Sequence, residues 1–355
     1  MEGIAVRRLS EIVLRRADSG ALLPGPSKTF CGILLSMVAL AGTVSANTNT
    51  NSGKATVIVL VGAPGEESFG KVFADAAANW KKAAHSAGAK FIEIGVSESP
   101  ATNDLQEFRS ALERASKDTN DELWVAMIGH GTFDGRQTKF NLRGPDLSAL
   151  ELSNLLAAVH RPVAIINGSS SSGPFIKALS APNRIVVTAT RSGAEENFTR
   201  FGKYVSLAIA DPEADLDKDG QTSLLEAFLM ASRRVAEFYK NEGRLATEHA
   251  LIDDNGDGFG TPSEWFRGIR AVKKAANDSP LDGMRAHQWH LIRSTQDQKL
   301  SPEDRKRRDE LELEINQLRQ YKTQMSEDEY YSKLEALLTK LGEIELSTES
   351  SAKLK

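Results

Sequence analysis

The chain alternates between short apolar runs and longer stretches in which apolar residues recur every three or four positions. Apolar runs lie at 56–61, 123–128, 163–166 and 185–189, and the short segment 91–94 also has the composition of a strand. A run that is apolar at every position suits a strand covered on both faces, whereas the three-to-four spacing indicates an amphipathic helix. We therefore predict an α/β fold, with a parallel sheet, right-handed crossovers and helices on both faces. Asp134-Gly135 inside 133–142 predicts a hairpin.

The pattern changes after Gly193. Residues 201–210 have helical spacing, and a further helical pattern lies between two acidic, glycine-containing loops at 215–226 and 253–264. In the charged segment 296–355, serine N-caps start two helices with narrow apolar seams. The seam residues are Leu311, Ile315, Leu318 and Met325 in the first helix, and Tyr330, Leu334, Leu337, Leu341 and Ile344 in the second. We predict a helical hairpin, or a coiled-coil arm that self-associates.

The first 46 residues have the order of a secretory signal. Basic residues precede the apolar run 30–41, and Val44-Ser45-Ala46 offers a small-residue cleavage site. We predict a signal peptide at 1–46, a disordered lead-in at 47–54, and a periplasmic or secreted mature chain without a stable membrane span. An uncleaved anchor, or a start downstream of Met1, is the alternative. Cleavage removes Cys31, the single cysteine, and with it any thiolate chemistry.

Charge and histidine spacing add little. Lys and Arg total 44 against 48 Asp and Glu, a formal net charge of −4, so no nucleic-acid partner is predicted. The histidines outside the candidate sites, His287 and His290 among them, show no metal-ligand spacing beyond isolated pairs. We interpret them as surface or core residues.

The first acidic loop matches a calcium-binding loop at every ligand position. Asp215, Asp217 and Asp219 supply carboxylates, and Gly220 permits the turn. The remaining ligands are the Gln221 carbonyl, Ser223, where a water often bridges, and a bidentate Glu226. Closely spaced carboxylates repel one another without a cation. The loop therefore predicts Ca²⁺ as a cofactor.

The second acidic loop also matches, with departures. Its ligand positions hold Asp253, Asn255, Asp257, Phe259 (through its carbonyl), Thr261 and Glu264. Extra glycines and Pro262 do not suit a helix that leaves the loop, and Thr222 and Gly260 replace the apolar residue that joins paired loops. We do not expect a standard EF-hand pair, and two Asx-rich surface turns are the alternative interpretation. The predicted divisions are an α/β domain at 55–210, a calcium-loop helical region at 211–295 and a helical arm at 296–355.

Two predicted strand ends carry candidate catalytic residues. His130-Gly131 follows the run 123–128, and a serine-rich turn that ends in Ser172-Gly173 follows the run 163–166. Ligands and catalytic groups gather at the carboxyl edge of an open parallel sheet. This order resembles the caspase-like cysteine peptidases, the legumain type most closely, over 55–193. The resemblance implies a caspase-like sandwich, with His130 as the catalytic histidine and Ser170 in the place of the catalytic cysteine.

The serine changes what that site is expected to do. A hydroxyl becomes a nucleophile only in direct contact with a base, whereas a thiol ionises partly by itself. Three hypotheses for this site remain open. The site is a catalytically inactive peptidase site that still binds a protein or peptide; Ser170 and His130 form an active endopeptidase, with the Gly131 N–H helping to hold an oxyanion; or both residues are structural. We rank the first slightly ahead of the second.

Overall fold

The computed structural model describes residues 55–97, 103–117, 122–276 and 279–353. The predicted signal peptide (1–46) and lead-in (47–54) lie outside the described residues. Among the described helices, none is long and apolar enough to cross a bilayer.

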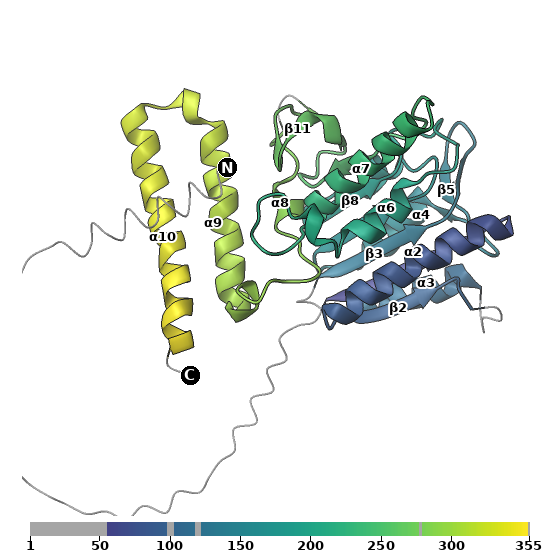
Figure 1. Ribbon diagram of the computed structural model, residues 1–355, viewed down its shortest axis with the longest axis horizontal. Coiled ribbons are helices and arrows are strands. Elements are labelled where there is room, and N and C mark those ends of the chain that lie inside the picture. Colours follow the sequence, from purple (N-terminus) through teal and green to yellow (C-terminus); the bar gives the residue numbers. More distant parts are fainter. Residues whose placement is uncertain (1–54, 98–102, 118–121, 277–278, 354–355) are drawn as a thin grey trace, which may run out of the picture. The chain divides into compact units, whose positions relative to one another are not determined.

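A seven-stranded sheet forms the centre of the described chain, in the order β10-β9-β8-β7-β3-β1-β2 (Figure 1). Its five parallel strands are β1 (Thr56–Val61), β2 (Lys90–Ile94), β3 (Leu123–Ile128), β7 (Val163–Asn167) and β8 (Arg184–Thr188). Every residue of β1, β3 and β7 is buried, as the continuous apolar runs require. The predicted α/β architecture is confirmed.

Two antiparallel strands extend the sheet beyond β8. They are β9 (Leu251–Asp253) and β10 (Thr261–Pro262). In the sequence, these residues lie only in or beside the second acidic loop. Strands of three and two residues are too short to show an alternating pattern, so only the pairing of β9 with β8 and of β10 with β9 reveals them.

Helices cover both faces of the sheet and form two apolar cores. One core contains α2 (Glu67–Ser86), α6 (Phe201–Ala208) and α7 (Leu224–Asn241), which lie in front of the sheet in Figure 1. The other contains α3 (Asp104–Ser116), α4 (Ala149–Leu156) and α5 (Phe175–Leu179). Alternate residues of β1 point to opposite cores, with Val57 and Val59 in the first and Ile58 and Leu60 in the second.

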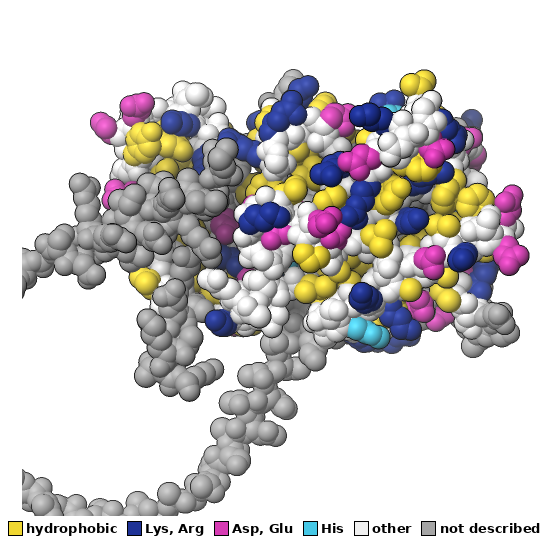
Figure 2. Space-filling view, viewed as in Figure 1, with side chains coloured by type: hydrophobic (Ala, Val, Ile, Leu, Met, Phe, Trp, Pro, Cys, Tyr) yellow, Lys and Arg dark blue, Asp and Glu magenta, His cyan; other side chains and the backbone are white. Residues whose placement is uncertain are grey.

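The predicted hairpin is also present. It consists of β4 (Gly131–Phe133) and β5 (Thr138–Phe140), and β6 (Leu147–Ser148) adds a third strand. A smaller pair, β11 (Phe266–Arg267) and β12 (Arg270–Ala271), follows the second acidic loop. On the face drawn in Figure 2, basic and acidic side chains are interspersed.

The C-terminal segment is a helical hairpin. Helices α9 (Pro302–Gln320) and α10 (Glu327–Lys353) pack together, and α9 also contacts α8 (Met284–His287). The Asn316 side-chain amide lies 2.7 Å from the sulfur of Met284. The Gln288 amide donates to the Asp309 carbonyl at 2.8 Å and to Glu312 at 3.0 Å. The arm is therefore docked within its own chain.

One buried carboxylate organises this docking. Asp297, 2% exposed in its side chain, pairs with Arg293 at 3.2 Å and with Arg305 at 3.1 Å, and it also pairs with Arg308. Arg293 continues to Glu122, just before β3, at 2.7 Å. Burial raises the pKa of Asp297, but the charges of Arg308, Arg293 and Arg305 outweigh it and hold the pKa below its usual range. The cluster links the sheet to the arm.

Candidate functional site

The two candidate catalytic residues lie at neighbouring strand ends. β3 and β7 pair in parallel, with Leu123 opposite Val163 and Met127 opposite Asn167. The Gly168 N–H continues the ladder by donating to the Met127 carbonyl at 2.9 Å. His130-Gly131 and Ser169-Ser170 therefore follow adjacent strands at one edge of the sheet.

The hydroxyl of Ser170 is bonded to the backbone of Gly131. Its Oγ donates to the Gly131 carbonyl at 3.0 Å and accepts from the Gly131 N–H at 3.1 Å. Ser170 is only 3% exposed. A Cβ at position 131 would lie 2.2 Å from the Ser170 carbonyl oxygen, so only glycine permits this approach. The N–H expected to hold an oxyanion thus already contacts the serine side chain.

His130 is engaged elsewhere. Its Nε2 lies 3.3 Å from the Pro64 carbonyl oxygen, and its ring packs against Phe69, Phe73 and Phe198 at centroid distances of 4.8, 5.2 and 5.8 Å. Burial lowers the pKa of this imidazole. Among the described residues, no hydrogen bond joins His130 to Ser170 or to a carboxylate. The structure brings the pair to one edge without forming a serine–histidine–acid relay.

The other serines of the turn hold backbone in place. Ser169 donates to the Asn167 side chain at 2.7 Å. The Ser172 hydroxyl accepts from the N–H groups of Ala189 and Thr190 at 3.1 and 3.2 Å. Ser171 differs, because its buried hydroxyl has no partner among the described residues and its φ is +51°.

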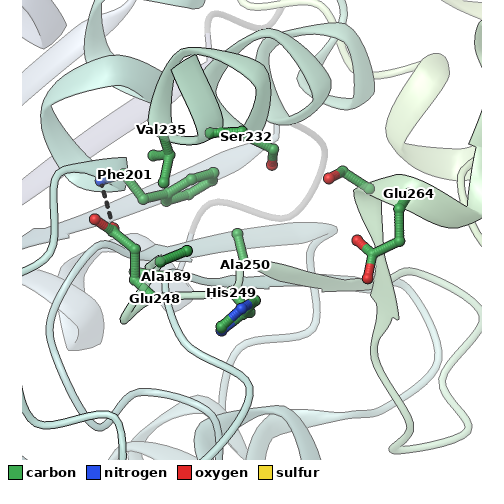
Figure 3. Close-up of a pocket in the computed structure, with 11 residues that line it drawn as sticks. Ala189, Phe201, Ser232, Val235, Glu248, His249, Ala250 and Glu264 are labelled. Atoms are coloured by element: carbon green, nitrogen blue, oxygen red, sulfur yellow. Dashed lines mark hydrogen bonds between the residues drawn. The ribbon is translucent and has the colours of Figure 1, made fainter. Parts of the chain in front are cut away.

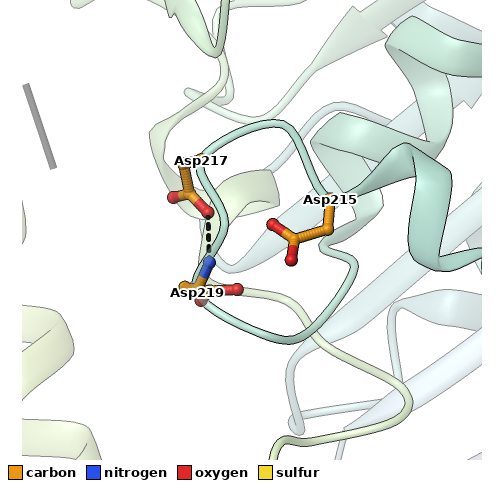
Figure 4. A group of neighbouring side chains, drawn as sticks. All are labelled: Asp215, Asp217 and Asp219. Carbon is orange, nitrogen blue, oxygen red and sulfur yellow. Dashed lines mark hydrogen bonds between the residues drawn. The ribbon is translucent and has the colours of Figure 1, made fainter. Parts of the chain in front are cut away.

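The three aspartates of the first acidic loop converge (Figure 4). Each of Asp215, Asp217 and Asp219 offers an oxygen within 4.8 Å of the others. Asp215 accepts from the N–H groups of Lys218 and Gly220 at 2.6 and 3.1 Å. The Asp219 N–H donates to Asp217 at 3.2 Å, the bond drawn in Figure 4. These bonds hold the three carboxylates in one turn, an arrangement that suits a cation with oxygen ligands.

Glu226 closes the loop from the first turn of α7. It is 1% exposed, and its oxygens accept from the N–H groups of Leu216 and Ser223 at 2.7 and 2.8 Å. Ser223 caps α7 and completes a capping box with Glu226. Burial, with the charges of Asp217 and Glu226, raises the pKa of Asp219 to about 6. The predicted ligand Gln221 uses its side chain to accept from the Ser294 N–H at 3.0 Å, which leaves its carbonyl for the loop.

The second acidic loop repeats the backbone pattern of the first. Asp253 accepts from Gly256 and Gly258 at 3.0 and 3.1 Å. The side chain of Asn255 accepts from the Asp257 N–H, and that of Asp257 from the Phe259 N–H, both at 2.8 Å. The first loop makes the equivalent bonds, from the N–H groups of Lys218 and Gly220 to Asp215 and from that of Gln221 to Asp219. The two loops therefore share the same turn.

The end of the second loop differs. Thr261 belongs to β10, and its hydroxyl donates to buried Asp282 at 2.5 Å. Glu264 lies in a short 3₁₀ turn, Ser263–Trp265, and borders a cavity. Among the described acidic and histidine residues, a three-member cluster forms at the first loop and not here. Among the described residues, no β-bridge joins the two loops. Ser223 forms an isolated antiparallel β-bridge with His290, whereas Thr261 pairs with Ile252 where β10 meets β9.

Two histidines that the sequence analysis assigns to surface or core lie against the first loop. His287 Nε2 is 2.9 Å from an oxygen of Asp217, and His290 Nε2 is 4.0 Å from an oxygen of Asp219. Burial, together with the charge of His287, lowers the pKa of His290 to about 3. The sequence offers one signal for this site, the closeness of His287 and His290 along the chain. That signal does not reveal the contact of His287 with Asp217, which lies 70 positions earlier.

A separate cavity of about 120 Å³ lies between α7, the segment that precedes β9 and the turn after β10 (Figure 3). His249 borders it and is held by Glu195, with Nδ1 2.6 Å from a carboxylate oxygen. Glu248 points to the start of α6, where it accepts from the N–H groups of Arg200 and Phe201, the latter drawn in Figure 3. Burial raises the pKa of Glu248. Its oxygens thus cap a helix instead of facing a ligand.

Comparison with known proteins gives structural similarity at low identity. No protein-family model matches the sequence, and no curated protein matches it. The Drosophila initiator caspase Dronc is 13% identical with a TM-score of 0.41, covering 66% of this chain and 94% of its own. Caspase-1 from Spodoptera frugiperda is 11% identical at 0.38, covering 57% and 86%. Raptor from Chaetomium thermophilum is 9% identical at 0.30, covering 44% and 17%.

Proposed function

We propose that this chain is an exported, calcium-binding homologue of caspase-like peptidases whose strand-end site binds a protein or peptide without cleaving it efficiently. The observation that carries the proposal is the pair of hydrogen bonds between the Ser170 hydroxyl and the backbone of Gly131. The caspase-like assignment itself is supported by the order of the motifs and by their position after adjacent parallel strands.

Hydrolysis by Ser170 needs groups that are engaged elsewhere. A serine hydroxyl reacts when a base takes its proton in direct contact. His130 instead contacts Pro64, and the Ser170 proton lies toward the Gly131 carbonyl. An oxyanion next to Ser170 would also compete with the serine for the Gly131 N–H. These contacts support a binding role over an endopeptidase role.

The calcium proposal rests on the number and kind of donors. The first loop offers three converging carboxylates and a buried Glu226, beside the carbonyl of Gln221 and the hydroxyl of Ser223. Ca²⁺ takes six to eight oxygen ligands, so the donor set suits it. An ion that binds only the folded chain stabilises it, by about 2.7 kcal/mol at a hundredfold excess over the dissociation constant. The second loop, with the same turn, is proposed as a second calcium loop.

Thermal unfolding of the full chain in chelator and then in excess CaCl₂ tests this proposal. We expect the native chain to melt higher with calcium and Glu226→Gln to lose most of that gain. Glu237→Gln is the matched control, because Glu237 lies exposed on the same helix and pairs with Arg233. Identical melting of the native chain in chelator and calcium, without heat in titration calorimetry, contradicts calcium binding.

Export rests on the leader pattern alone. N-terminal sequencing of the exported protein is expected to start just after Ala46. A mature chain that retains Cys31 contradicts both the cleavage and the absence of a thiol.

A further inference from the structure

Two histidines from a later segment of the chain, His287 and His290, lie beside the first acidic loop. His287 ends α8 and His290 follows it. The Leu224 N–H donates to the Trp289 carbonyl at 2.8 Å, and Ser223 bridges His290, so the end of the loop and this segment are fixed to each other. The two imidazoles therefore keep defined positions relative to the aspartates.

The ring of His290 presents a lone pair that nothing in the described chain satisfies. Its Nδ1 lies 3.2 Å from the Gln288 carbonyl oxygen, and a carbonyl only accepts, so Nδ1 carries the hydrogen. Nε2 is then an acceptor, in a ring only 5% exposed, and it has no hydrogen-bond partner among the described residues. Buried polar atoms without partners are rare and call for an explanation.

The Nε2 atom of His290 faces a second hydrogen-bond acceptor. The nearest charged oxygen is that of Asp219, at 4.0 Å. Two acceptors that face each other at this separation repel, unless a positive group lies between them. One metal ion bonded at about 2.0–2.2 Å to an imidazole nitrogen and to a carboxylate oxygen spans this distance.

We propose that His290 Nε2 and the carboxylate of Asp219 bind a divalent transition-metal ion of the Zn²⁺ class. Imidazole nitrogen suits such ions, whereas Ca²⁺ takes oxygen ligands. His287 acts as a positioning residue through Asp217, because its Nε2 donates to that carboxylate at 2.9 Å and the Asp219 N–H donates to the same carboxylate at 3.2 Å. The site shares Asp219 with the proposed calcium loop, so the two ions compete. The proposal does not rest on calcium binding.

Metal titration of the full, chelator-treated chain tests the proposal. Zn²⁺ affinity is measured by competition with a chromophoric chelator for the native chain, for His290→Leu and for His160→Leu, whose histidine is exposed. We expect stoichiometric Zn²⁺ binding by the native chain, a loss of at least about tenfold in His290→Leu and no change in the control. Equal affinities in native chain and His290→Leu, or no Zn²⁺ binding because only water occupies the gap, overturn it.

A spectroscopic measurement on the native chain avoids reliance on one variant. With one equivalent of Cu²⁺, pulsed electron paramagnetic resonance is expected to show imidazole-nitrogen coupling that is lost in His290→Leu. Nitrogen coupling that persists unchanged in His290→Leu overturns the assignment to His290. Calcium stabilisation without Zn²⁺ binding refutes this inference and leaves the calcium proposal intact, and the converse result refutes the calcium proposal alone.

Discussion

Replacement of Ser170 by alanine separates a structural serine from a catalytic one through stability. The hydroxyl makes two hydrogen bonds to Gly131, at 3.0 and 3.1 Å, and the residue is 3% exposed. Alanine removes both bonds and leaves the buried Gly131 N–H without this acceptor. An unsatisfied buried group costs about 1–3 kcal/mol. We therefore expect Ser170→Ala to lower the free energy of unfolding by about 2 kcal/mol.

The assay is chemical and thermal denaturation of the native chain and the variant, both in chelator. A loss of about 2 kcal/mol lowers the melting temperature by roughly 4 °C in a chain of this size. Ser171→Ala is the matched control, because its buried hydroxyl has no partner among the described residues and alanine there removes no bond. We expect the control to be neutral or slightly stabilising.

The opposite result has a clear meaning. Active sites are often strained, and removing a catalytic group commonly leaves stability unchanged or raises it. A Ser170→Ala chain as stable as the native one, or more stable, refutes the hydrogen-bonded role of this serine.

Three further predictions concern the helical arm. Asp297→Asn breaks a buried ion cluster and is expected to lower the free energy of unfolding by about 3–5 kcal/mol and to speed hydrogen exchange in α9. Glu303→Gln, at an exposed residue of the same helix, is expected to change neither. Equal exchange in the native chain and both variants contradicts the docking role. Because the pKa of Asp297 is lowered in the folded chain, its contribution is present above the usual aspartate range and is lost as pH falls below it. Truncation before Ser301 is expected to lower the oligomeric state or the stability, as sedimentation and melting measure; identical values contradict a self-associating or docked arm.

The sheet could be predicted because its central strands are apolar at nearly every position. The runs 56–61 and 123–128 coincide with β1 and β3, since short apolar runs between turn residues suit strands covered on both faces. β9 could not be predicted from three residues that also begin an acidic loop. Its pairing with β8 is a tertiary contact without a local signal.

The candidate sites also combine local features, which the sequence predicts, with long-range contacts, which it does not. The ligand order of the first acidic loop is local, so the sequence alone predicts the convergence of Asp215, Asp217 and Asp219. The contact of Ser170 with Gly131 joins residues 39 positions apart, and that of His287 with Asp217 joins residues 70 apart. Neither leaves a pattern along the chain, because packing of the sheet and of α8 creates them.

The proposed loss of peptidase activity is tested most directly by peptide hydrolysis by the native chain and by Ser170→Cys, with Ser170→Ala as the blank. We expect the native chain to hydrolyse a peptide library no faster than Ser170→Ala and to remain unlabelled at Ser170 by a fluorophosphonate probe. A thiol beside His130 ionises without tight contact to a base, so Ser170→Cys is expected to gain hydrolysis that a thiol reagent abolishes. Rapid hydrolysis by the native chain, lost in Ser170→Ala and accompanied by labelling of Ser170, would contradict the account and make this protein a serine peptidase.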